Sequence, residues 1–225
     1  MSNDPSHPED IPINRRRCVE EMRQCGRPTG EMGIKVAHDM NDHHARLWQW
    51  GLEHVELPDN EKAAILDIGC GSGMLMKIVS ERTRAAQLYG LDHSSDMVTL
   101  SRETCEEVCS EGRAEFVTGS VSQLPFDDAA FDLVTAFETI YFWPDMEGDL
   151  REVRRVLREG GVFLAVTESY DHPEFAERNQ YCMEITGGQM FTPERIAAFL
   201  EEAGFKDIQM DTVEEKNWMA VMAVR

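Results

Sequence analysis

The stretch ILDIGCGSG, residues 65–73, decides the fold of this chain. The apolar run at 63–68 predicts a buried strand, and three glycines follow it at alternate positions. Glycine has no Cβ and adopts left-handed backbone angles readily, so such a loop turns sharply and brings main-chain N–H groups close to a ligand at a helix N-terminus. Three glycines can also serve a tight turn that binds nothing, and residues 65–73 by themselves do not decide between these two roles.

Strand patterns and helix patterns alternate after this loop. Apolar strands alternating with helices predict a parallel sheet covered on both faces, which is an α/β, Rossmann-like, doubly wound fold. The binding edge of such a sheet lies at the carboxyl ends of its strands, where the glycine loop falls. The last two strands are joined by a short connection, which favours antiparallel pairing. We expect strands at 63–68, 87–92, 114–118, 131–137, 162–167, 205–213 and 218–224, and helices at 71–84, 95–111, 145–159 and 193–204, the third ending at Gly160-Gly161.

Length and composition indicate one main domain with additions at its N-terminal side. The chain has 225 residues, of which 42% are hydrophobic, enough for a sizeable core. Residues 1–14 are polar and proline-rich and are expected to form a flexible tail. Residues 15–60 read as largely helical and are expected to form an N-terminal helical cap. Residues 61–225 are expected to form the main domain, which contains the glycine loop and its ligand site.

Charge and cysteine content exclude several classes of function. The formal net charge of −20 disfavours phosphate backbones and anionic lipids, so neither nucleic acid nor a membrane is an expected partner. No apolar run has the length of a membrane span or the character of a signal peptide. The six cysteines lack the paired spacing of a zinc ribbon, which predicts a reduced, cytoplasmic protein. The oligomeric state is not indicated.

Two further features narrow the choice of ligand. The loop reads G-x-G-x-G, whereas the dinucleotide fingerprint requires glycine where Met74 stands. Asp92 ends the second strand, and a carboxylate there accepts hydrogen bonds from ribose hydroxyls in nucleotide-binding α/β folds. A helix-capping or surface role for Asp92 stays open. The tip of the third strand, at 119–121, is expected to flank a base held nearby.

Four motifs in order resemble those of the class I S-adenosylmethionine-dependent methyltransferases. They are ILDIGCGSG, LDHSSDMV, GSVSQLPFDDAAFDLVTAFETIYFWPD and LREVRRVLREGGVFLAV. The resemblance covers roughly residues 63–225. It implies a seven-stranded sheet whose last strand runs antiparallel, and S-adenosyl-L-methionine as the cofactor.

The resemblance also implies roles for individual residues. Asp67 and the glycine loop would hold the amino-carboxylate end of the cofactor, and Asp92 would bind its ribose. Many relatives have Asp where this chain has Ser120, whose hydroxyl accepts a hydrogen bond but carries no charge. The full cofactor set implied is Asp67, Gly69, Cys70, Gly71, Gly73, Asp92, His93, Met97, Ser120, Val121 and Phe137.

Two segments are expected to cover the acceptor side of the site. Residues 36–57 have an apolar stripe at helical spacing and resemble a stretch that precedes the first motif in some bacterial methyltransferases. Residues 167–191 lie where the family inserts acceptor-binding elements. The candidates for the acceptor side are Asn41, His44, Glu138, Tyr141, Tyr170 and His172. An ordinary packing or surface role stays open for His44, Tyr170 and His172.

A cluster of histidines and acids between His38 and His44 raises the question of a metal. On a helix these side chains point in different directions, so no metal site is expected.

The sequence thus predicts a methyltransferase that moves a methyl group to a small-molecule acceptor by in-line displacement. Orientation alone supplies several kcal/mol in such a reaction, so no catalytic side chain is assigned. The alternatives are a non-catalytic cofactor-binding or accessory protein and an NAD-dependent oxidoreductase, against which Met74 argues.

Overall fold

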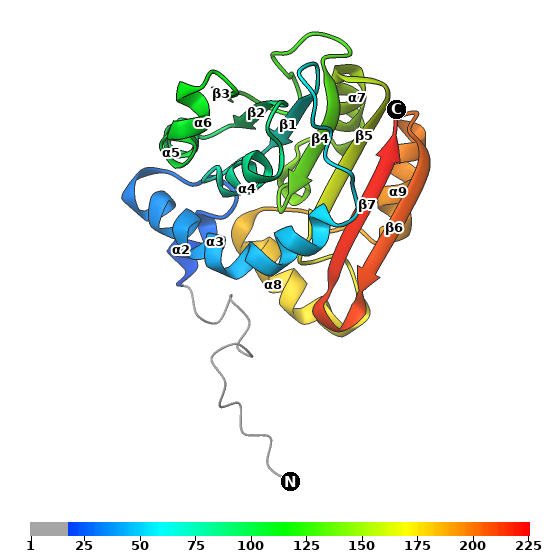
Figure 1. Ribbon diagram of the computed structural model, residues 1–225. Helices are drawn as coiled ribbons and strands as arrows, with labels where there is room; N and C mark the ends of the chain where they lie inside the picture. Colours follow the sequence, from blue (N-terminus) through cyan, green and yellow to red (C-terminus); the bar gives the residue numbers. More distant parts are fainter. Residues whose placement is uncertain (1–17) are drawn as a thin grey trace.

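A seven-stranded sheet forms the centre of the protein (Figure 1). The computed structural model describes residues 18–225, so the predicted tail at 1–14 lies outside the described residues. The strand order is β3-β2-β1-β4-β5-β7-β6, and β7 pairs antiparallel with both β5 and β6. This confirms the doubly wound fold with an antiparallel last strand. The strands are β1 (Ala64–Ile68), β2 (Gln87–Asp92), β3 (Ala114–Thr118), β4 (Phe131–Phe137), β5 (Leu157–Thr167), β6 (Lys206–Val213) and β7 (Trp218–Val224).

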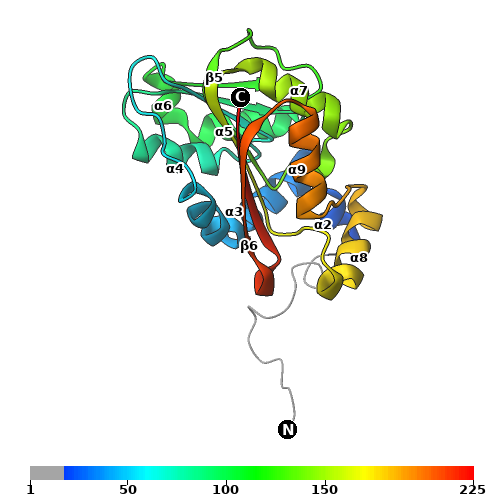
Figure 2. The ribbon, with the colours of Figure 1, turned by 90° about the vertical axis from the view of Figure 1, so that its right-hand side faces the viewer.

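Helices cover both faces of the sheet, as the edge-on view shows (Figure 2). One face carries α3 (Gly30–Leu52), α4 (Met74–Arg82), α5 (Ser95–Thr104) and α6 (Glu106–Ser110), and the other carries α7 (Met146–Val156) and α9 (Pro193–Glu202). The short helix α2 (Val19–Arg23) packs against α8 (Ala176–Thr186). None of the described helices combines the length and apolarity that crossing a membrane requires.

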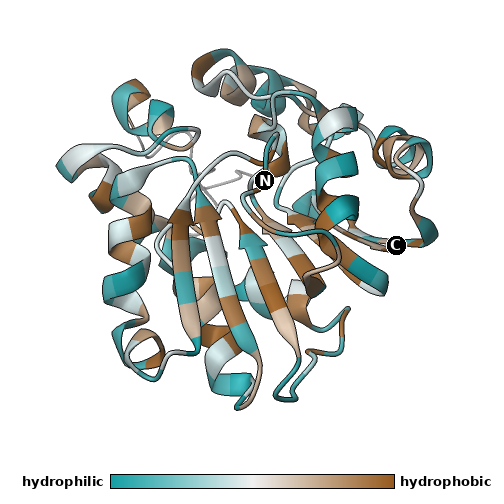
Figure 3. Cartoon of the chain, turned by 90° about the horizontal axis from the view of Figure 1, so that it is seen from above, coloured by the Kyte–Doolittle hydropathy of each residue, from teal (hydrophilic) through white to brown (hydrophobic). Residues whose placement is uncertain are grey.

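Apolar residues on the two sides of the central strands build two separate cores. In β1, Leu66 and Ile68 pack in the layer under α7 and α9, whereas Ile65 packs in the layer under α3 and α4. Apolar colouring is therefore frequent along the central strands, while the outer helix surfaces are mostly hydrophilic (Figure 3). Burial on both faces explains why these strands read as nearly continuous apolar runs.

The structure corrects several expected elements, and the helix expected at 95–111 is in fact two helices, α5 and α6, divided at Cys105. The pair Gly160-Gly161 does not end a helix, because α7 already ends at Val156 and both glycines lie within β5. Gly160 has φ +77°, beside a register shift between β4 and β5, so the glycine serves an irregular strand. The segment expected to be helical at 15–60 contains two helices among the described residues, α2 and α3, and Pro28 lies in the break between them. Helix α8 was not predicted.

We expect burial in the layer under α3 and α4 to be a main source of stability. Met76 in α4 is fully buried, whereas Met32 in α3 is 43% exposed. Met76→Ala should lower the free energy of unfolding by roughly 2–5 kcal/mol because it leaves a cavity. The matched control Met32→Ala should change it by less than about 0.5 kcal/mol. Urea denaturation measures both, and equal losses would contradict this assignment of the core.

Candidate functional site

The glycine loop after β1 is held in a conformation that only glycine adopts easily. Gly69, Gly71 and Gly73 have φ values of +77°, +52° and +78°. The N–H groups of Gly69 and Cys70 donate to the Leu91 carbonyl oxygen at 2.7 and 3.0 Å, which fixes the loop to the end of β2. A Cβ on Gly69 would lie 2.3 Å from Thr139 Cγ2. The loop therefore presents main chain, without side chains, at the carboxyl edge of the sheet.

Asp92 lies at the tip of β2 and contacts this loop directly. Its Oδ2 accepts a hydrogen bond from Gly71 N at 3.0 Å, and its Oδ1 accepts one from Ser94 N at 2.8 Å. Burial raises the pKa of Asp92, and the two main-chain hydrogen bonds oppose that shift. Each carboxylate oxygen accepts more than one hydrogen bond, so acceptor capacity remains for a ligand. Helix α5 is capped by Ser94 rather than by Asp92.

Asp67 is a second buried carboxyl group beside the loop. Its Oδ1 accepts a hydrogen bond from Thr135 Oγ1 at 2.7 Å. Burial raises the pKa of Asp67 to about 7, the Thr135 hydrogen bond opposes the shift, and the charge of Asp92 adds to it. The charge of this carboxyl group therefore changes close to neutral pH.

The cap helix α3 is tied to the loop and to the start of α5. Ser72 Oγ donates to Asn41 Oδ1 at 2.6 Å, and Gly30 N donates to Asp96 Oδ2 at 2.7 Å. These hydrogen bonds join residues far apart in sequence. They place α3 across the open side of the loop.

A cavity of about 290 Å³ lies between the strand tips and the cap. This volume is close to the lower end of small-molecule pockets, which are roughly 300–1,000 Å³. The cavity brings together most of the predicted site residues, namely Asn41, His44, Asp67, Gly69, Cys70, Gly71, Asp92, His93, Met97, Ser120, Val121, Phe137, Glu138 and Tyr141.

Three predicted residues do not line this cavity. Gly73 lies behind the loop, where a Cβ would be 2.8 Å from Ser101 Cα, so its absent side chain permits close packing on α5. Tyr170 is buried, and its carbonyl oxygen accepts hydrogen bonds from Asn179 and Asn217. His172 packs against the Tyr170 ring, with 5.7 Å between ring centroids. Both residues follow Ser169, and neither is part of the cavity wall.

Ser120 and Phe137 line the cavity in different ways. Ser120 is exposed at its rim, and its Oγ accepts a hydrogen bond from Ser122 N at 3.2 Å. Phe137 belongs to the core under α3, and its ring is so close to Gly51 that a Cβ there would lie 2.6 Å from Phe137 Cε1. Phe137 therefore forms a wall of the cavity, while Ser120 remains accessible to solvent.

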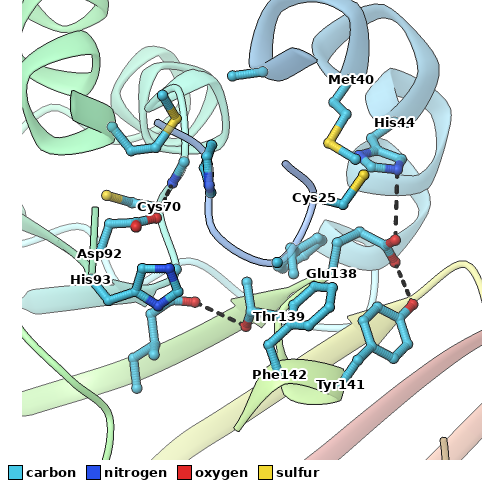
Figure 4. A pocket seen from close by; sticks show the side chains of 18 of the residues that line it. Cys25, Met40, His44, Cys70, Asp92, His93, Glu138, Thr139, Tyr141 and Phe142 are labelled. Carbon is cyan, nitrogen blue, oxygen red and sulfur yellow. Dashed lines mark hydrogen bonds and ion pairs between the residues drawn. The ribbon is translucent and has the colours of Figure 1, made fainter. Parts of the chain in front are cut away.

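The other end of the cavity holds a cluster of ionisable side chains (Figure 4). Glu138 follows β4, and its Oε1 accepts hydrogen bonds from the Tyr141 hydroxyl at 3.1 Å and from Glu168 N. His44 Nε2 lies 3.6 Å from Glu138 Oε2 and 3.5 Å from Glu168 Oε1. It is buried and has no hydrogen-bond partner among the described residues. We call His44, Glu138, Tyr141 and Glu168 the acceptor-end cluster.

The two glutamates of this cluster differ in their ionisation. Burial raises the pKa of Glu138 well above its usual value, and the charge of Glu168 raises it further. Burial also acts to raise the pKa of Glu168, but His44 and His43 outweigh it and hold that pKa below its usual value. The glutamate nearer the histidines therefore carries the charge more readily.

Glu168 was not among the predicted site residues, and it corrects one expectation. His43 and His44 were expected to point in different directions, but both reach Glu168. His43 Nε2 lies 2.7 Å from Glu168 Oε2, and ligand atoms of the three residues lie within 4.8 Å of one another. The signal available in the sequence was an acid directly after the fifth strand, at the same sheet edge as Asp92 and Glu138.

This fold and site define a class of protein. A sheet of this order, with a G-x-G-x-G loop after β1 and a carboxylate at the tip of β2, is the class I methyltransferase architecture. A family model described as a methyltransferase domain matches residues 66–165. The match and the fold together indicate a methyltransferase domain of the class I, S-adenosylmethionine-dependent type over this part of the chain, and S-adenosyl-L-methionine is the cofactor of that class.

Curated relatives match part of their own length. A fatty-acid O-methyltransferase from Mycolicibacterium smegmatis is 36% identical over 148 residues, which are 64% of this chain and 52% of the relative. An uncharacterised chloroplastic methyltransferase from Arabidopsis thaliana is 31% identical over 139 residues, or 58% of this chain and 39% of the relative. The chain thus spans about half or less of the length of these two relatives.

Solved structures share the fold at low sequence identity. One is a chain from the complex of the Haloferax volcanii Trm112 methyltransferase activator with a putative methyltransferase, with a TM-score of 0.75, 19% identity, and coverage of 91% of this chain and 97% of that chain. Another is the geranyl diphosphate C-methyltransferase from Streptomyces coelicolor, with a TM-score of 0.72, 13% identity, and coverage of 99% and 100%.

Asp67 should make the stability of the ligand-free protein depend on pH. The folded protein keeps a proton on this carboxyl group up to about pH 7, whereas the unfolded chain loses it near the ordinary value of 3.8. The folded state binds more protons between these values, so its contribution to stability is present at low pH and is lost as pH rises through this window. Asp67→Asn should therefore gain stability relative to the parent between about pH 4 and pH 7.

Urea denaturation across pH 4 to pH 8 measures the difference between parent and variant. The exposed control Asp127→Asn should show no comparable trend. If the difference in unfolding free energy between Asp67→Asn and the parent does not change with pH, Asp67 does not hold a proton in the folded state over this range.

Proposed function

We propose that this protein transfers a methyl group from S-adenosyl-L-methionine to a small-molecule acceptor. The observation that carries the proposal is one cavity with two chemically distinct ends. One end is formed by the glycine loop, Asp67 and Asp92, and the other is formed by the acceptor-end cluster. In Figure 4, Asp92 and His93 lie across the pocket from His44 and Glu138.

The residues at the first end fit the cofactor. A Cβ on Gly71 would have only Gly69 O, at 4.0 Å, as a neighbour, so packing inside the protein does not require this glycine. Close approach of a ligand to the main chain, together with φ +52°, accounts for it. In this proposal Asp67 faces the cofactor's amino group, and Asp92 accepts hydrogen bonds from the ribose hydroxyls. Cys70, His93, Met97, Ser120 and Val121 complete the walls.

The protein's contribution to such a reaction is mainly alignment. The acceptor atom, the methyl carbon and the sulfur must lie on one line, and water must be kept out. The strand tips form one side of the cavity, and α3 covers the opposite side. When bound, the cofactor supplies an already activated methyl group, so the residues of this chain need only bind, orient and remove a proton.

The acceptor is a small molecule in this proposal because the cavity is small, about 290 Å³, and its walls are largely apolar. The Mycolicibacterium smegmatis relative is named for fatty-acid methylation, and the Streptomyces coelicolor structure for geranyl diphosphate. The absence of a nucleic-acid partner and a cytoplasmic location stay predictions from charge and cysteine usage.

Isothermal titration of the purified protein with S-adenosyl-L-methionine, S-adenosyl-L-homocysteine and NAD tests the cofactor. We expect binding of the first two and none of NAD, because the loop lacks the third glycine of the dinucleotide fingerprint. Binding of NAD alone would overturn the proposal in favour of an oxidoreductase. Cofactor binding without product formation against a broad metabolite panel would favour a non-catalytic binding protein.

The role of Asp92 is tested by substitution. Asp92→Ala should weaken cofactor binding by about tenfold or more, since loss of a charged hydrogen-bond partner costs roughly 1.5–3 kcal/mol. The exposed control Asp127→Ala should bind normally. Because Asp92 also accepts from Gly71 and Ser94, thermal melting of the ligand-free variant must establish that it is folded. Unchanged affinity in a folded Asp92→Ala protein would contradict the ribose role.

A further inference from the structure

The ionisable side chains that line the cavity are mostly acidic, with two histidines, His44 and His93, beside them. Among its described lining residues are the carboxyl groups of Asp67, Asp92, Glu138 and Glu168, and there is no lysine or arginine. Arg178, whose charge acts on Glu138, instead donates hydrogen bonds to Ser169 Oγ and Asn179 Oδ1. A buried anion needs a cationic or hydrogen-bonding partner to offset its desolvation. This cavity therefore opposes an acceptor that carries a carboxylate or a phosphate.

The four carboxyl groups divide into two pairs along the sheet. Asp67 and Asp92 belong to β1 and β2, at the glycine loop, whereas Glu138 and Glu168 follow β4 and β5. In the strand order β2-β1-β4-β5, these pairs lie on opposite sides of the boundary between β1 and β4. The proposed cofactor role uses the first pair and leaves the second pair unassigned.

The second pair has the features of a site for a cation. Glu138 Oε2 and Glu168 Oε1 both lie near His44 Nε2, at 3.6 and 3.5 Å, and these separations are longer than a good hydrogen bond. His44 is 4% exposed, and its Nε2 has no hydrogen-bond partner among the described residues. An ammonium group offers hydrogen-bond donors to both carboxylates and reduces their mutual repulsion.

The main chain at Glu138 is strained in a way that positions its side chain. Glu138 has φ +61°, a left-handed value that is strained for a residue other than glycine. Hydrogen bonds from Glu168 N and the Tyr141 hydroxyl to Oε1 hold this conformation. Such strain is concentrated at ligand-binding and catalytic sites. It leaves Oε2 directed toward His44.

The surrounding wall is suited to a hydrocarbon body. Met40, Phe142, Trp143, Met183 and Met190 line the same cavity as the acceptor-end cluster. Methionine side chains adapt to varied apolar shapes, and aromatic faces attract cations. The ligand that matches both the wall and the cluster is an amine with an apolar body.

We propose that the methyl acceptor is a primary or secondary amine with an apolar body, whose nitrogen is held by Glu138 and Glu168. This inference rests on the proposed methyltransferase function. The ammonium first gives one proton to the Glu138 carboxylate that holds it, which exposes the nitrogen lone pair. The lone pair then forms the bond to the methyl carbon while the carbon–sulfur bond breaks and its electron pair stays on sulfur. The products are the N-methylated ammonium and the neutral thioether.

A metal ion is the competing occupant of this end of the cavity. His43, His44 and Glu168 offer three ligand atoms spread over as much as 4.8 Å. Tetrahedral zinc with bonds of about 2.0–2.2 Å would need these atoms closer together. His43 already contacts Glu168 at the exposed side of the cluster, so the amine is favoured and zinc becomes an outcome of the test.

Two sets of ligands test the proposal, each set consisting of an amine, an alcohol and an acid with the same hydrocarbon body. The protein loaded with S-adenosyl-L-homocysteine is titrated with hexylamine, hexanol and hexanoate, and with phenethylamine, phenethyl alcohol and phenylacetate. We expect each amine to bind about tenfold or more tighter than its matched alcohol and acid. With S-adenosyl-L-methionine, mass spectrometry should detect N-methylated product from the amines that bind.

Substitutions identify the groups responsible. Glu138→Gln and Glu168→Gln should each reduce the preference for amines by about tenfold and leave S-adenosyl-L-homocysteine affinity nearly unchanged. The exposed control Glu174→Gln, a few residues beyond Glu168, should retain the preference. Thermal melting checks that each variant folds. Because two different glutamates are substituted, failure of one variant to fold leaves the other as the test.

The outcomes separate this inference from the function on which it rests. No binding of S-adenosyl-L-homocysteine overturns the proposed function itself. Cofactor binding without any amine preference overturns the amine inference alone. Zinc binding that Glu168→Gln abolishes, without a preference for amines, would replace the amine by a metal site.

Discussion

The hydrogen bonds between the glycine loop and the end of β2 are the interaction on which the site depends. Two loop N–H groups donate to the Leu91 carbonyl oxygen, and a third, from Gly71, donates to Asp92. The loop and the carboxylate are therefore positioned as one unit. Positive φ angles at Gly69, Gly71 and Gly73 make this geometry possible, and the parallel pairing of β1 with β2 brings the two strand ends to the same edge.

This arrangement buries acidic groups that do not stabilise the ligand-free protein. Asp67 and Asp92 are 2% and 7% exposed, and burial raises the pKa of each. A cationic ligand group would relieve this cost and favour their ionised forms. The same features that make the site suited to a positively charged cofactor thus lower the stability of the protein without it, a trade-off common at functional sites.

The sequence predicted the sheet well because the information for each central strand is local. The bounds of β2, β3 and β4 agree with the prediction, since each strand lies between clear turn residues. Helix α8 was missed because its apolar residues do not follow one face, and its one buried residue is Asn179. Gly160-Gly161 was misread because glycine after a helix pattern usually ends the helix, whereas here the pair lies in a strand beside a register shift.

The residues of the site also fall into two groups, those that local sequence predicted and those that it missed. The glycine loop and Asp92 were predicted because their spacing relative to the strands determines their position. Glu168 was missed, because its position beside His44 depends on how a helix more than a hundred residues earlier crosses the strand ends. The sequence held the residue types of this contact but no signal for the packing that joins them.

The hydrogen bond between Asn41 and Ser72 has a consequence for geometry. Asn41 and His44 are three residues apart on α3, which places them about 4.5 Å apart along the helix axis and on neighbouring positions of one face. The helix α3 thus fixes the spacing between the residue that contacts the glycine loop and the residue that belongs to the acceptor-end cluster. Inserting one residue between them would rotate one of the two side chains by about 100° about the helix axis, so the register of α3 sets the spacing between the glycine loop and the acceptor-end cluster.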